Sequence, residues 1–146
     1  MKTVIVITWL IRLLLIFHFF YDGLIKLLDM QWFALWLKTI VGNIAVANVL
    51  TYAIPIFEVV TAILLVVQSL ALRMLYAAFG FFIFMVSGIV VIFFKGVVIF
   101  HPYHTYWNKP EWNEVILFNI SLAIIAFAGI IGLEYSPKQK QTKFAV

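Results

Sequence analysis

The chain has 146 residues, of which 66% are hydrophobic and only 11% are charged, with a mean hydropathy of +1.13. Soluble domains are about 45–50% apolar and about 25% charged because their surfaces contact water, so this composition excludes a water-soluble domain. The absence of cysteine excludes disulfides, thiolate metal sites and thiol relays. The net charge of +4 is spread too thinly to indicate nucleic-acid binding.

Four apolar segments are long enough to cross about 30 Å of hydrocarbon as helices. They cover about residues 4–28, 48–68, 72–94 and 115–133, and a basic tail follows at 135–146. The sequence therefore predicts a single all-α domain over residues 1–146, a transmembrane four-helix bundle. The first segment could be taken for a signal peptide, but no small-residue cleavage site follows it, so we expect a retained span.

The connection between the first two spans, residues 29–47, mixes aromatic, aliphatic and polar side chains. Trp32 and Trp36 lie on it, and Gly42-Asn43 is a typical helix stop near its end. This pattern predicts a short amphipathic helix lying in the membrane interface, anchored by the two tryptophans.

Ionisable residues recur in the first span, where they are costly unless they face the protein interior or one another. Arg12, His18, Asp22 and Lys26 fall within about 120° of arc on a helix, so they form one stripe. His18, Asp22 and Lys26 are successive i,i+4 neighbours, which allows Asp22 to accept hydrogen bonds from both sides.

The second span carries Glu58, one turn after Pro55, where we expect a kink. Counting about 1.5 Å per residue from the helix ends places both Arg12 and Glu58 near the middle of the bilayer. A carboxylate at that depth needs a partner, so we expect Arg12 to pair with Glu58 and Asp22 to pair with Lys26 near the outer surface. These charges either fix helix packing or form a site for a substrate, a proton or a quinone.

The last two spans each carry small residues on one face, a pattern that lets helix backbones approach closely. These residues are Gly80, Ser87 and Gly88 in the third span, and Asn119, Ala123, Ala126 and Gly129 in the fourth. In the outer loop before the fourth span, His101 and His104 are candidate metal ligands. Two histidines in an aromatic, proline-broken loop are more typical of interfacial hydrogen bonding, so we expect no metal site.

Positive charge beside the spans predicts the orientation. The side with both termini carries Lys2, Arg73, Lys138, Lys140 and Lys143, and the opposite side carries Lys26, Lys38, Lys95 and Lys109. This excess favours a multi-pass protein with both termini in the cytoplasm.

Several of these residues match the pattern of a known family: Arg12, Gly23-x-x-Lys26, Pro55-x-x-Glu58, and Trp112 followed by Asn119. Over about residues 8–133 the chain resembles the DoxX/MauE-type small membrane proteins. The resemblance implies four helices and a link to redox processes: maturation of the disulfide-rich methylamine dehydrogenase for MauE, and quinone-linked oxidation for DoxX and DoxD relatives. It marks Lys26, Pro55, Glu58 and Asn119 as signature polar positions.

The chain departs from this family in its outer loop. Many MauE-like members carry a cysteine pair before the last span, where this chain has His101-Pro102-Tyr103-His104. Without thiols, dithiol exchange with a thioredoxin-like partner is excluded.

Three functions remain open at this point. The favoured one is a non-catalytic subunit that anchors other membrane or periplasmic proteins of a complex. The second is a quinone-interacting electron-transfer subunit, in which His18 would hydrogen-bond a quinone carbonyl. The third is a small transporter or ion pathway, for which four helices would need homo-oligomerisation. We expect no enzyme activity because no catalytic motif is present.

Overall fold

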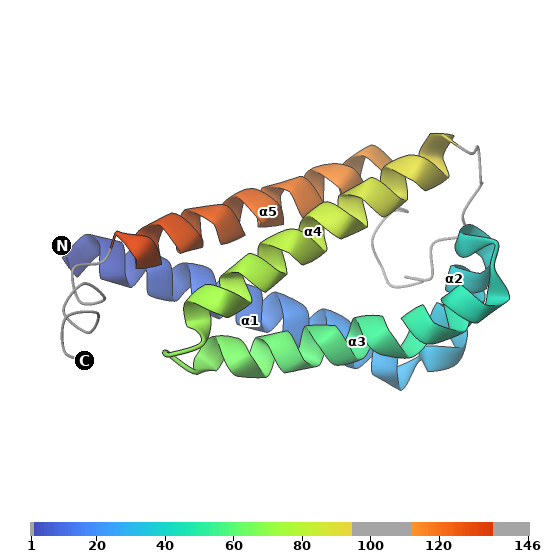
Figure 1. Cartoon of the computed structure of the whole chain (residues 1–146), viewed down its shortest axis with the longest axis horizontal. Coiled ribbons are helices and arrows are strands. Elements are labelled where there is room, and N and C mark those ends of the chain that lie inside the picture. Colours follow the sequence, from blue (N-terminus) through green and yellow to red (C-terminus); the bar gives the residue numbers. More distant parts are fainter. Residues whose placement is uncertain (1, 95–111, 136–146) are drawn as a thin grey trace.

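The computed structural model describes residues 2–94 and 112–135. Within these residues the chain forms five α-helices and no strand: α1 Lys2–Leu28, α2 Met30–Val41, α3 Ile44–Val66, α4 Ala71–Phe94 and α5 Trp112–Glu134 (Figure 1). All except α2 are long and apolar enough to span a membrane. The predicted all-α, four-span architecture is therefore confirmed.

The four long helices pack as two pairs. One pair is α1 with α3, the other is α4 with α5, and α5 also packs along α1 (Figure 1). The start of α1, the end of α5 and the turn between α3 and α4 lie at one end of the bundle, which we call the terminal end. The short helix α2 lies at the opposite end and packs mainly on α3.

The predicted helix in the first connection is confirmed as α2, and the glycine and asparagine that follow it define its end. Gly42 has a φ of 69°, a left-handed conformation that stops the helix. The Asn43 side chain then accepts hydrogen bonds from the backbone nitrogens of Ala45 and Val46, at 3.0 and 3.2 Å. This cap starts α3 at Ile44, four residues before the predicted start of the second span.

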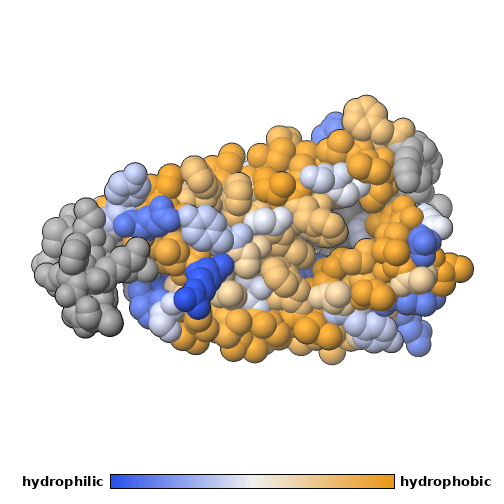
Figure 2. Space-filling view, in the orientation of Figure 1, coloured by the Kyte–Doolittle hydropathy of each residue, from blue (hydrophilic) through white to orange (hydrophobic). Residues whose placement is uncertain are grey.

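Apolar side chains form both the core and most of the surface. Core residues from the four long helices include Leu15, Phe19, Leu65, Leu75, Phe82, Leu122, Ala126 and Ile130. In Figure 2, apolar side chains cover most of the visible face, and hydrophilic ones gather toward its two ends. Bulky residues such as Phe17, Val49 and Leu117 are more than 60% exposed. Such a surface is compatible with lipid and not with water.

The small residues of α5 pack as expected, but those of α4 do not. A Cβ at Gly129 would lie 2.9 Å from the Ile11 side chain, so this glycine allows α5 to approach α1 closely. By contrast, Gly80 and Gly88 of α4 are exposed, and a Cβ there would meet nothing within 4 Å. The predicted packing face of α4 was therefore wrong. The larger residues Leu75 and Phe82 occupy its buried face instead.

Candidate functional site

Lys26 lies between two carboxylates contributed by different helices. Its ammonium donates to Asp22 Oδ2 at 2.6 Å, within α1, and to Glu58 Oε1 of α3 at 2.5 Å. Lys26 is 7% exposed and Glu58 1%, whereas Asp22 is half-buried. The predicted Asp22–Lys26 pair is confirmed. We call Asp22, Lys26 and Glu58 the lysine centre.

The predicted pairing of Arg12 with Glu58 was wrong because the two residues lie at different levels of the bundle. Gly23 packs directly against Glu58. Arg12 precedes Gly23 by eleven positions, which is about 16 Å along a helix. Lys26 reaches Glu58 instead, since helical side chains point toward the N-terminus of their own helix.

Arg12 binds the C-terminal end of α3. Its Nε and Nη2 donate to the Leu65 carbonyl at 3.1 and 2.6 Å, Nη2 also donates to the Val66 carbonyl at 3.2 Å, and Nη1 donates to Gln68 Oε1. The last four carbonyls of a helix have no partner within it and carry a partial negative charge. The buried guanidinium therefore caps α3. Sequence reasoning missed this role and missed Gln68, a polar residue just after α3.

A glycine sets the distance between α1 and α3 at the lysine centre. A Cβ at Gly23 would lie 3.0 Å from both Glu58 Cβ and Val59 Cγ2, and 3.2 Å from the Pro55 carbonyl oxygen. These neighbours are a backbone atom and side-chain atoms close to the α3 backbone, so they cannot move far without shifting the helix. Gly23 thus allows Lys26 to reach Glu58.

We expect Gly23→Ala to lower the free energy of unfolding by about 1–3 kcal/mol, the usual cost of overpacking. Denaturant titration of the purified protein in detergent micelles would measure this. Gly88→Ala is the matched control, because the same methyl group enters open space there. Equal effects of the two substitutions would contradict the assigned role of Gly23.

The other predicted residues have different neighbours. Half-buried His18 is surrounded by the rings of Phe19, Phe82 and Phe118, with ring centroids 5.5–5.7 Å from its own. Asn119 donates to the Val115 carbonyl of its own helix. A quinone hydrogen bond to His18 stays a prediction.

Two further predictions are not decided by these contacts. Pro55 is buried inside α3, and the kink expected there stays a prediction. The candidate metal ligands His101 and His104 lie outside the described residues. Among the described residues, no group of three His, Asp or Glu side chains is placed to hold a metal ion.

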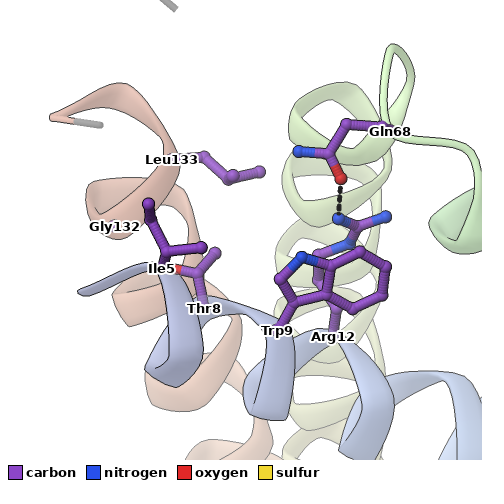
Figure 3. A pocket seen from close by; sticks show the side chains of 7 residues that line it. All are labelled: Ile5, Thr8, Trp9, Arg12, Gln68, Gly132 and Leu133. Atoms are coloured by element: carbon purple, nitrogen blue, oxygen red, sulfur yellow. Dashed lines mark hydrogen bonds between the residues drawn. The ribbon is translucent and has the colours of Figure 1, made fainter. Parts of the chain in front are cut away.

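A cavity of about 370 Å³ lies at the terminal end, beside Arg12. Its lining residues come from α1, α5 and the α3–α4 turn: Ile5, Thr8, Trp9, Arg12, Gln68, Gly132 and Leu133 (Figure 3). The sequence alone gave no sign of this cavity, because it depends on where α3 ends relative to α1.

Comparison with protein-family models, curated proteins and solved structures finds no match for this chain.

Proposed function

We propose that this chain is a non-catalytic integral membrane subunit of the DoxX/MauE-like type. It anchors other proteins of a complex in the bacterial inner membrane. The resemblance to the DoxX/MauE-type proteins links this complex to redox processes. We propose that both termini face the cytoplasm, because in the sequence more lysines and arginines flank the spans on the side of the two termini than on the opposite side. The proposal rests on one observation: the charged side chains within the spans hold α1 and α3 together.

The charges of α1 and α3 are used inside the chain. Lys26 is hydrogen-bonded to both Asp22 and Glu58, and Arg12 caps α3. Charged groups that serve transport or catalysis instead face an aqueous pathway or a ligand. At the lysine centre, the arrangement supports a rigid helix pair with an outer surface available for other membrane proteins.

Purification in a mild detergent tests the anchoring function. We expect at least one other protein to remain bound in a fixed ratio, and to dissociate in a harsher detergent that leaves this chain folded. Recovery of this chain alone from the mildest extraction that solubilises it would contradict the proposal.

Photo-crosslinking in intact membranes tests the same proposal without detergent. A benzophenone amino acid at Phe17, Val49 or Leu117 places the reactive group on the exposed faces of α1, α3 and α5. We expect a covalent product with another protein from at least one of these positions. Phe19 is the matched control, because it lies two residues from Phe17 but is fully buried. Products with lipid alone at all three exposed positions would contradict an anchoring role.

A further inference from the structure

The cavity beside Arg12 exists because α1 extends further than α3 at the terminal end of the bundle. Val66, the last residue of α3, lies at the level of Arg12, whereas α1 extends ten residues further, to Lys2, or about 15 Å. α5 runs beside this extension, and Gly132 lies against Thr8. The space between them is large enough for a small ligand group, since binding pockets start at about 300 Å³.

The polar groups around this cavity are mainly hydrogen-bond donors. Arg12 has five N–H groups and makes four hydrogen bonds, which leaves one at Nη1. The Gln68 amide nitrogen and the Trp9 indole nitrogen donate to no partner in the described part of the chain. In Figure 3 these two side chains lie on either side of the guanidinium, and Trp9 stacks 4.4 Å from it. Such a set of donors fits a ligand that carries oxygen acceptors.

In the described part of the chain, no carboxylate balances the charge of Arg12. No Asp or Glu among the described residues forms an ion pair with its guanidinium. The end of α3 supplies only about half a negative charge. Glu134, the last residue of α5, also lies at the terminal end. Its carboxylate accepts a hydrogen bond from the Tyr76 hydroxyl at 2.6 Å. A bound anion would therefore complete the charge balance of a buried cation.

We propose that this cavity binds a phosphate group, and that an anionic phospholipid supplies it. The cavity lies level with the α3–α4 turn, where a spanning helix pair meets the headgroup layer. Basic pockets between helices at the cytoplasmic side of a membrane are the usual sites for such headgroups. This site is independent of the proposed anchoring function.

Gln68→Glu is the decisive substitution because it removes the anion site while keeping the α3 cap. The new carboxylate would occupy the place of the amide oxygen that already accepts from Arg12. It would neutralise the guanidinium in place, so the melting temperature should stay the same or rise. Ser69→Glu is the matched control, since it adds the same charge on the next residue, which does not line the cavity.

Binding would be measured on the delipidated full chain by native mass spectrometry. We expect dioleoylphosphatidylglycerol to bind about tenfold or more tightly than dioleoylphosphatidylcholine, because the choline cation cancels the negative charge that Arg12 would attract. Gln68→Glu should remove this preference and Ser69→Glu should keep it. Leu133→Trp, which adds bulk to the α5 side of the cavity, should weaken phosphatidylglycerol binding as well.

A parallel titration with inorganic phosphate identifies the source of the group. A rise in melting temperature with phosphate, absent in Gln68→Glu and without lipid preference, would assign the site to soluble phosphate. Equal binding of the two lipids with no effect of phosphate would overturn the proposal. Loss of the lipid preference in Ser69→Glu to the same degree as in Gln68→Glu would also overturn it, because surface charge would then explain the binding.

Discussion

Lys26→Met is expected to be the most destabilising single substitution in this chain. It leaves the carboxylates of Asp22 and Glu58 facing one another without the ammonium that now contacts both. Removing one partner of a buried ion pair costs about 3–5 kcal/mol, because the remaining charge stays buried without compensation. The free energy of unfolding, measured by denaturant titration in detergent micelles, should fall by about that amount.

The three-residue arrangement makes the expected effects non-additive. Asp22→Asn and Glu58→Gln should each cost less than Lys26→Met, since Lys26 keeps one carboxylate in either variant. Adding Glu58→Gln to Lys26→Met should restore part of the lost stability, because the deeply buried carboxylate is then neutral.

The control for general charge effects is Lys38→Met, which replaces an exposed lysine of α2 and should change the free energy of unfolding by less than about 0.5 kcal/mol. Strict additivity of Lys26→Met and Glu58→Gln would show that the two side chains do not interact in the folded protein.

The parts of the fold that depend on local sequence could be predicted. The four spans follow from continuous apolar runs, and the end of α2 follows from Gly42 and Asn43. The Asp22–Lys26 pair follows from i,i+4 spacing on one helix. Each of these features requires knowledge of a single segment and its neighbours in the chain.

The parts that depend on the register between helices could not be predicted. Counting residues from the span ends placed Arg12 and Glu58 at one depth, but Gly23 fixes Glu58 about 16 Å from the level of Arg12. A carboxylate is also not the only partner for a buried guanidinium, since the carbonyls at the end of α3 serve as well. The exposed Gly80 and Gly88 show the same limit, because small residues allow contact without requiring it.

The second large effect is expected at Arg12. Arg12→Met removes the three hydrogen bonds to the Leu65 and Val66 carbonyls at the end of α3 and the fourth to the Gln68 side chain. An unsatisfied buried polar group costs about 1–3 kcal/mol, so we expect a loss of about 3 kcal/mol in the free energy of unfolding. Arg12→Lys should recover only part of it, because one ammonium cannot reproduce the planar fork that reaches both carbonyls and Gln68.

Arg73→Met separates capping from charge at the same end of the bundle. Arg73 is an exposed arginine in the first turn of α4, so its replacement should leave the free energy of unfolding within about 0.5 kcal/mol of the wild-type value. Hydrogen exchange of α3 amides would locate the effect of Arg12→Met, since loss of the cap should increase exchange in the last turn of α3 more than at Glu58. Uniform changes along α3, or full recovery by Arg12→Lys, would show that Arg12 acts through its charge alone and not as a cap.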